Sequence, residues 1–444
     1  MAHRNERARI TRRDIIKTAA AGVAGAALGP AIVTSKSKAQ QKTLKILQWS
    51  HFVPGYDKWF DEQYTKEWGQ KNGMEVKIDH ISSAEIPARA AAEVSAQRGH
   101  DLFMFLSPPA AYEDQVIDHG EIVQEVERKH GKMLELALKS TFNPKTKKYF
   151  GFSDSYVPDP GNYRKDLWDD VGVFPDTWDK VLDGGRKVKQ KHGNPVGVGM
   201  SQELDSNMAM RAILWSFGAS VQDEQGRVVI NSKQTIEALK FGRALYKETM
   251  TPEIFTWDVS SNNRFMLAGK GSFVCNAISV TRTAEKTNPE MSEKIQIART
   301  PKGPVRRIAA EHVMDVYVIW KFAENKEGAK KFLLDYIDNF REGFLASEFY
   351  NFPSFPKTVP DLVPLISHDP KAKPPDKYKV LADVTEWATN VGYPGYASAP
   401  VDEVFNTFVI PTMFAKVALE QMSPEEGAKS AEREIKRIFE KWKA

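Results

Sequence analysis

The feature that most constrains the fold is an alternation of strand and helix patterns early in the chain. Apolar and polar residues alternate over 43–49, as in a half-buried strand, and 101–106 is an almost continuous apolar run. Such runs are typical of strands buried within a parallel sheet. Between them lie a helical pattern, a further strand and a second helical pattern, over 56–71, 75–80 and 86–98. This order predicts an open α/β sheet.

Open sheets of this kind bind ligands beyond the carboxyl ends of their strands. Trp49, His51 and Phe52 stand at the end of the first predicted strand, and Ser107 follows the third. These four residues are therefore the first candidates for a binding site.

The 444 residues of the chain are too many for one hydrophobic core, so two domains are expected. Turn-forming residues dominate 151–161, which predicts a crossing between the domains. A Pro-rich stretch over 351–375 is expected to be an ordered surface loop. Helical spacing prevails elsewhere, with Thr177 and Ser232 as predicted N-caps, over 177–191, 207–217, 232–248, 326–336 and 423–442.

The N-terminal segment has the pattern of an export signal. Arg12 and Arg13 precede two apolar residues and a lysine, which resembles a twin-arginine signal, and a weakly apolar stretch follows. Small residues before Gln40 predict cleavage after Ala39. The alternative is a membrane anchor, but the apolar stretch is short for a span and is interrupted by Gly and Pro30. We therefore expect a twin-arginine signal peptide over 1–39 and a soluble protein in a Gram-negative periplasm.

Charge and cysteine content narrow the function classes. The chain has 62 basic and 58 acidic residues, but the segment 1–39 holds eight of the basic and two of the acidic ones. The remainder carries 54 basic and 56 acidic residues, so no basic excess indicates nucleic acid or anionic lipid as a partner. Cys275 is the single cysteine and lies in an apolar run, which predicts a buried structural thiol and no internal disulfide.

Five segments resemble a known family in their order and spacing. The first is the opening strand with its terminal aromatic, at 46–49, and the second is the Tyr-Arg-Lys-Asp-Leu stretch within 162–168. Two helix starts follow the same pattern as the family, Pro-Asp-Thr-Trp-Asp within 174–179 and Asn-Lys-Glu-Gly-Ala within 324–333. The fifth is the strand entry Phe-Met-Leu-Ala-Gly-Lys within 265–273. Together they resemble the extracellular solute-binding proteins of ABC importers, in the branch typified by maltose-binding protein.

The resemblance implies an α/β fold of the periplasmic-binding-protein type. Two α/β lobes would be joined by a hinge that the chain crosses three times, near Ser155, near Ile308 to Glu311 and near Ile337. Residues 42–154 and 309–336 would form one lobe, and residues 155–308 and 337–444 the other. A small polar solute, most simply a sugar or oligosaccharide, would lie between the lobes and pass to the transmembrane permease of the importer. A monomer with no cofactor and no metal is expected.

Position along the chain selects the candidate ligand-binding residues. Sugars present apolar ring faces and many hydroxyls, so their sites combine aromatic platforms with planar polar groups. The alternative for each candidate is a packing role in the core. The candidates are Trp49, His51, Phe52, Ser107, Asp154, Tyr156, Trp215, Trp257, Asn276, Ser279, Glu311, His312 and Tyr396.

The sequence also allows alternative solutes and an alternative function class. Glu311 and His312 stand where sugar-binding members often have paired glycines, which keeps amino sugars, polyols and other cationic solutes as alternatives. A polyamine, phosphonate or metal chelate bound by the same fold is another alternative. An exported enzyme is a further alternative. It is disfavoured because the chain has no His-x-x-x-His pair and no Gly-x-Ser-x-Gly turn, and because Gly269 to Ser272 lacks the glycine spacing of a phosphate loop.

Overall fold

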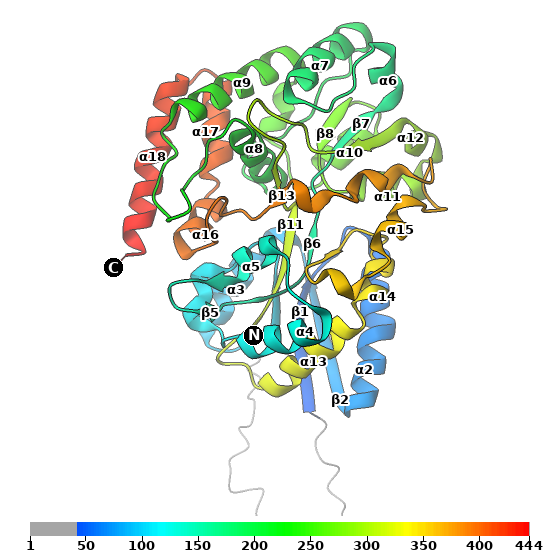
Figure 1. Cartoon of the computed structure of the whole chain (residues 1–444), viewed down its shortest axis with the longest axis vertical. Helices are drawn as coiled ribbons and strands as arrows, with labels where there is room; N and C mark the ends of the chain where they lie inside the picture. Colours follow the sequence, from blue (N-terminus) through cyan, green and yellow to red (C-terminus); the bar gives the residue numbers. More distant parts are fainter. Residues whose placement is uncertain (1–41, 444) are drawn as a thin grey trace, which may run out of the picture. The chain divides into compact units, whose positions relative to one another are not determined.

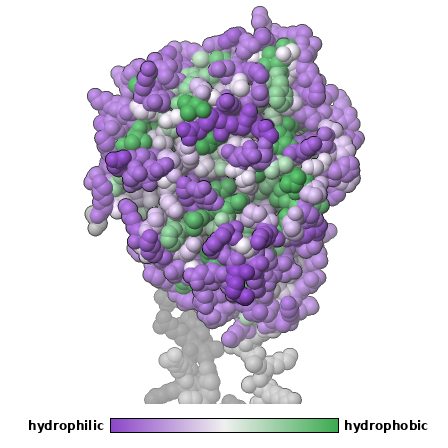
Figure 2. All heavy atoms as spheres, in the orientation of Figure 1, coloured by the Kyte–Doolittle hydropathy of each residue, from purple (hydrophilic) through white to green (hydrophobic). Residues whose placement is uncertain are grey.

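The computed structural model describes residues 42–443, which belong to one compact unit. The predicted twin-arginine signal peptide over 1–39, with its cleavage site after Ala39, lies outside the described residues. Within 42–443 no helix is both long and apolar enough to cross a membrane. On the face shown in Figure 2 hydrophilic side chains cover most of the surface, with apolar residues in smaller groups between them.

A six-stranded mixed sheet forms the core of the first lobe, named lobe 1 here (Figure 1). The strands predicted early in the chain, β1, β2 and β3, pair in parallel, and β1 lies between the other two. Three later strands complete the sheet in antiparallel pairings. The order is β12-β6-β11-β3-β1-β2, with bounds Phe352–Pro353, Phe152–Val157, Val313–Ile319, Leu102–Phe105, Lys42–Trp49 and Met74–Ile81. The predicted α/β class is therefore confirmed.

Helices pack around this sheet and follow the predicted pattern. Asn325 caps the helix that starts at Lys326, since its side chain accepts a bond from the Gly328 amide. The predicted helix over 56–71 is built from two α-helical pieces joined by a π-helical turn over Phe60–Tyr64. The helices of lobe 1 are α1 (Pro54–Trp59), α2 (Thr65–Asn72), α3 (Ile86–Ala96), α4 (Gly120–His130), α5 (Glu135–Thr141), α13 (Lys326–Asp338) and α14 (Phe340–Ala346).

The second lobe, lobe 2, is built on a three-stranded antiparallel sheet with β7 at its centre. Its strands are β7 (Gly161–Arg164), β8 (Phe273–Cys275) and β9 (Ile295–Ala298). Cys275 is buried, as predicted, and burial raises the pKa of its thiol. The short pair of β10 (Ala309–Ala310) and β13 (Ala388–Thr389) packs against α8.

Helices make up most of lobe 2. The predicted N-caps are confirmed, because the side chains of Thr177 and Ser232 accept bonds from the backbone amides of Lys180 and Thr235. The tail helix begins with a capping box between Ser423 and Glu426. The helices are α6 (Lys165–Asp170), α7 (Trp178–His192), α8 (Leu204–Ser216), α9 (Lys233–Thr249), α10 (Ser261–Leu267), α11 (Ser279–Thr287), α12 (Pro289–Lys294), α15 (Leu362–Ser367), α16 (Ala399–Asn406), α17 (Val409–Ala418) and α18 (Pro424–Lys441).

Strand pairing indicates where the chain passes between the lobes. It leaves the larger sheet after β6 and enters the smaller one at β7, and it returns between β9 and β11. The strand β12 still pairs with β6, although it follows the predicted third crossing near Ile337. The predicted domain boundaries remain predictions, and this pairing favours a third crossing after Pro353.

Candidate functional site

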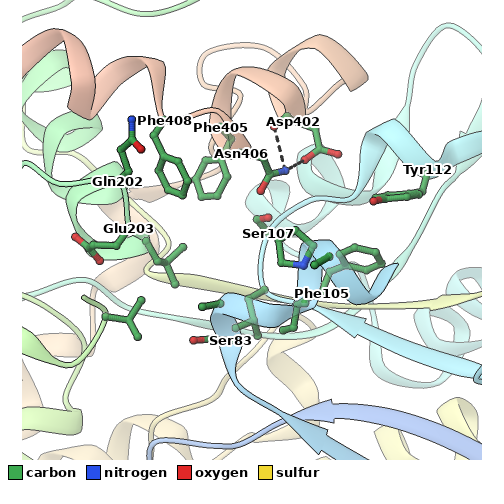
Figure 3. A pocket seen from close by; sticks show the side chains of 17 residues that line it. Ser83, Phe105, Ser107, Tyr112, Gln202, Glu203, Asp402, Phe405, Asn406 and Phe408 are labelled. Carbon is green, nitrogen blue, oxygen red and sulfur yellow. Dashed lines mark hydrogen bonds between the residues drawn. The ribbon is translucent and has the colours of Figure 1, made fainter. Parts of the chain in front are cut away.

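A cavity of about 420 Å³ lies between the two lobes (Figure 3). Lobe 1 contributes the start of α3, the end of β3 and Tyr112, while lobe 2 contributes the start of α8, Val259 and α16. The volume falls within the range of small-molecule sites, about 300–1,000 Å³. The lining residues are Ser83, Ala84, Ile86, Pro87, Ala88, Phe105, Leu106, Ser107, Tyr112, Gln202, Glu203, Leu204, Val259, Asp402, Phe405, Asn406 and Phe408.

The walls of this cavity combine aromatic and aliphatic surface with a few polar groups. Phe405 and Phe408 lie on the lobe 2 side, and Tyr112 lies on the lobe 1 side (Figure 3). Hydroxyl and amide groups come from both lobes, and none of the 17 lining residues is Lys, Arg or His. Such a surface is suited to a solute that has an apolar face and several hydrogen-bonding groups.

Glu203 is one of the two carboxyl groups in the lining. It caps the N-terminus of α8, where its oxygens accept bonds from the amides of Asp205 (2.7 Å) and Ser206 (2.5 Å). Burial, together with the nearby charge of Asp205, raises the pKa of Glu203 to about 8. The group therefore holds a proton near neutral pH unless a cation lies beside it.

Asp402 is the other carboxyl group, and it connects the two lobes. Its Oδ2 atom accepts a bond from the backbone amide of Ala111 in lobe 1 at 3.0 Å, and Asn406 donates to Oδ1 at 2.5 Å. Burial raises the pKa of Asp402 to about 7. The contact between α16 and the 3₁₀ helix η3 (Ala110–Gln115) thus closes one side of the cavity.

A buried polar network lies at the first and second crossings, next to the start of α8. His312 lies between two carboxylates, with Nδ1 at 3.2 Å from Asp159 and Nε2 at 3.3 Å from Asp205. Asn262 donates to Asp205 at 2.5 Å, and Asn276 donates to Asn262 at 2.8 Å. The predicted residues Asn276 and His312 therefore belong to one connected group.

The same network extends to α11. Asn276 also donates to Asn263, which in turn donates to the hydroxyl of Ser279 at 3.1 Å. Burial opposes the charge of His312, but the charges of Asp205 and Asp159 outweigh burial and raise the pKa of His312 to about 10. The network thus contains a protonated histidine near neutral pH. Among residues 42–443 no group of side chains forms a metal-binding cluster.

An aromatic cluster occupies the lobe 1 side of the first and second crossings. The rings of Trp49 and His51 are 4.7 Å apart, and Phe52 meets Trp49 edge-on at 5.3 Å. Tyr350 packs against His51 at 5.0 Å, and its hydroxyl is buried without a hydrogen-bond partner among residues 42–443. Burial lowers the pKa of His51 to about 4, although Asn351 hydrogen-bonds its Nε2 atom at 3.0 Å.

The remaining predicted residues belong neither to the polar network nor to the aromatic cluster. Ser107 lines the cavity. Asp154 bonds the hydroxyl of Tyr336 (3.2 Å) inside lobe 1, and Tyr156 packs against Phe352. The others are in lobe 2. Trp215 packs on Tyr393 and Trp257 packs on Phe265. Tyr396 lies near Phe142 of lobe 1, and Glu311 is buried near Arg211.

Sequence reasoning missed several residues that complete the site. Asp159 and Asp205 join the network, while Glu203, Asp402 and Phe405 line the cavity. Asp159 stands within the turn-forming segment that predicted the first crossing, so its position was accessible to the same argument. The others belong to helices whose packing brings them to the cleft, and no local pattern marks them.

Comparison with known proteins identifies the family. The model of the family described as bacterial extracellular solute-binding protein matches residues 53–347. The chain belongs to this family. The predicted resemblance is confirmed, and the family places the protein outside the cytoplasm as a binder of solutes. A protein of Deinococcus radiodurans described as a probable ABC transporter-binding protein is 25% identical over 157 residues, which span 33% of this chain and 37% of that protein.

Solved structures of solute-binding proteins share the fold. T. maritima MalE3 with bound maltose is 23% identical, with a TM-score of 0.73 over 89% of this chain and 99% of that chain. A sugar transporter protein from Arthrobacter chlorophenolicus with laminaribiose is 15% identical, with a TM-score of 0.73 over 89% and 99%. A solute-binding protein from Agrobacterium radiobacter with ribitol is 17% identical, with a TM-score of 0.72 over 89% and 98%. The periplasmic-binding-protein fold is thereby confirmed.

Proposed function

We propose that this solute-binding protein is the exported receptor of an ABC importer, capturing a sugar, oligosaccharide or polyol between its lobes and delivering it to the permease. The observation that carries the proposal is the cavity of about 420 Å³ between lobes joined by the bond from Ala111 to Asp402. The Deinococcus radiodurans relative supports the transporter, and the sugars and polyol in the similar structures support the solute class.

Closure around the solute is the proposed mechanism. A solute that contacts both walls of the cavity binds the closed form more tightly than the open form, and this difference in affinity drives closure. The permease then recognises the closed form. No chemical step is assigned, since the aromatic, amide and hydroxyl groups of the lining serve binding.

A thermal-shift screen against sugars, oligosaccharides and polyols tests the proposal. A solute at 100 times its dissociation constant stabilises the protein by about 2.7 kcal/mol. Phe405→Ala removes an aromatic side chain from the lining and should reduce this stabilisation. Turnover of a bound sugar by the purified protein would instead indicate an exported enzyme.

Export through the twin-arginine pathway and a monomeric state belong to the same proposal. Replacing Arg12 and Arg13 by lysine should keep the protein in the cytoplasm, as measured by cell fractionation. Retained export in that variant would contradict the twin-arginine route. Light scattering on the purified protein measures the oligomeric state.

A further inference from the structure

The interlobe cleft holds an unusual balance of charge. Four carboxyl groups are buried in or beside this cleft: Glu203 and Asp402 in the cavity lining, and Asp159 and Asp205 in the network at the crossings, with exposed fractions of 8%, 5%, 2% and 6%. We refer to these four as the cleft carboxyls. Their surroundings divide them into two pairs.

The inner pair is compensated. Asp159 and Asp205 both face the imidazole of His312, at 3.2 Å and 3.3 Å, and Asp205 also accepts a bond from Asn262. A protonated histidine between two carboxylates, with an amide donor beside them, offsets much of the unfavourable desolvation of these charges.

The outer pair has no cationic side chain beside it, although Glu203 caps the N-terminus of α8. Glu203 and Asp402 line the cavity, and the donors described above for them are uncharged: backbone amides and the side chain of Asn406. The lining contains no Lys, Arg or His among its 17 residues, so it supplies no cation to either group. Each accepted bond leaves lone pairs on these oxygens for a further donor.

An ionised carboxyl in such a place is unfavourable unless a positive charge joins it. In agreement with the geometry, burial raises the pKa of Glu203 to about 8 and that of Asp402 to about 7. A cationic solute would take the place of these protons. The rings of Tyr112, Phe405 and Phe408 also line the cavity and provide faces that attract a cation.

We propose that the solute is an amino sugar, whose ammonium group binds at Glu203 while its ring lies against the aromatic wall of the cavity. This inference rests on the proposed function. Hydroxyl and amide groups of Ser83, Ser107 and Asn406 are available for the hydroxyls of the sugar. Anionic sugars are excluded, because they would meet two carboxyl groups and no cation.

Matched sugars test the charge preference with the purified chain. Titration calorimetry compares glucosamine, galactosamine and mannosamine with their parent hexoses and uronates, and includes maltose, ribitol and spermidine. We expect the best amino sugar to bind at least tenfold more tightly than its parent hexose and the uronates not to bind. At pH 7, its binding heat should depend on the ionisation heat of the buffer, because protons leave Glu203 and Asp402.

The outcomes separate this inference from the proposed function. Tightest binding of a neutral sugar or polyol would leave the proposed function intact and overturn the amino-sugar inference. Tighter binding of spermidine than of any sugar would overturn both the sugar class and this inference. Binding by no member of the panel would contradict both proposals.

A charge-neutral variant localises the effect. Glu203→Gln keeps an oxygen to cap α8 but cannot become an anion, so it should weaken amino-sugar binding at least tenfold more than it weakens binding of the parent hexose. Glu237→Gln, on the exposed surface of α9, is the matched control and should change neither. If Glu203→Gln does not fold, Asp402→Asn removes the other carboxyl group of the lining and should lower the preference for the amino sugar over its parent hexose. Equal affinities in the variant and the native protein would overturn the inference.

Discussion

The two lobes bring different chemistry to the region where they meet. Lobe 1 contributes an aromatic cluster around Trp49 and His51, whose members contact one another mainly through ring faces and edges. Lobe 2 contributes carboxyl and amide groups, with Asp205, Asn262 and Asn276 joined in a chain of hydrogen bonds. Lobe 1, the aromatic side, therefore holds this region together by ring packing, and lobe 2, the polar side, by hydrogen bonds between buried polar groups.

Removal of the Asp205 carboxyl group, at the centre of the polar side, should have the largest effect on stability. Asp205→Ala leaves His312 with one carboxylate and leaves the Asn262 amide without its acceptor. Because breaking a buried pair strands a charge, we expect a loss of about 3–5 kcal/mol in the free energy of unfolding, measured by urea denaturation. Glu237→Ala, in an exposed pair with Lys240, should change it by less than about 0.5 kcal/mol. If Asp205→Ala loses no more unfolding free energy than Glu237→Ala, the network does not stabilise the fold.

A change on the aromatic side should have a smaller effect, since one ring can partly replace another. Trp49→Phe retains an aromatic side chain between His51 and Phe52 but leaves unfilled volume. We expect a loss of about 1–2 kcal/mol in unfolding free energy, measured by the same denaturation. Trp442→Phe, at an exposed position near the C-terminus, provides the control. A loss as large as that of Asp205→Ala would remove the distinction between the two sides.

Local patterns predicted much of the fold but only part of the candidate site. The parallel strands, the caps at Thr177 and Ser232 and the tail helix follow from periodicity and capping within a few residues. Asn276 and His312 were selected because they follow a strand or adjoin a crossing. The structure brings them together, and their role in binding stays a prediction.

The missing residues depend on contacts between distant parts of the chain. Asp205 meets His312 across more than 100 positions, and Asp402 meets the amide of Ala111 across 291. Such pairs arise from the packing of helices between lobes, which a single sequence does not encode in any short pattern. Trp215 shows that a local pattern can also be ambiguous. A large aromatic residue at the end of a helix is expected both for a sugar-stacking surface and for a core residue, and Trp215 is buried against Tyr393.

The raised pKa of Asp402, on the polar side, predicts that the unfolding free energy falls by about 1 kcal/mol between pH 6 and 8. Burial raises the pKa of Asp402 to about 7, whereas an aspartate in the unfolded chain titrates near 4. The folded state therefore retains a proton that the unfolded state has lost, and the stabilisation present below about pH 4 disappears as the pH rises through 7. Asp402→Asn should flatten the fall in unfolding free energy between pH 6 and 8 by about 1 kcal/mol, measured by denaturation at several pH values.

His51 provides the opposite dependence and thus an internal check on that experiment. Burial lowers the pKa of His51 to about 4, so the unfolded state binds a proton that the folded state lacks between about pH 4 and 6.5. Stability from this group rises over that interval and is constant above it. His51→Gln should therefore steepen the fall with pH, and an unchanged profile in both variants would contradict the assignment of these shifts to burial.

The smallest effect on stability is expected at Tyr350, where the two sides meet. Its ring belongs to the aromatic cluster, while its hydroxyl is buried without a partner among residues 42–443, and burial and the charges of Asp205, Asp315 and Asp159 raise its pKa. A buried hydroxyl without a partner does not stabilise the fold, so Tyr350→Phe should not lower the unfolding free energy. If the hydroxyl bonds the solute, the same variant weakens binding by about 1 kcal/mol, measured by calorimetry with the tightest sugar of the panel. Unchanged affinity with unchanged stability would assign Tyr350 to the aromatic side alone.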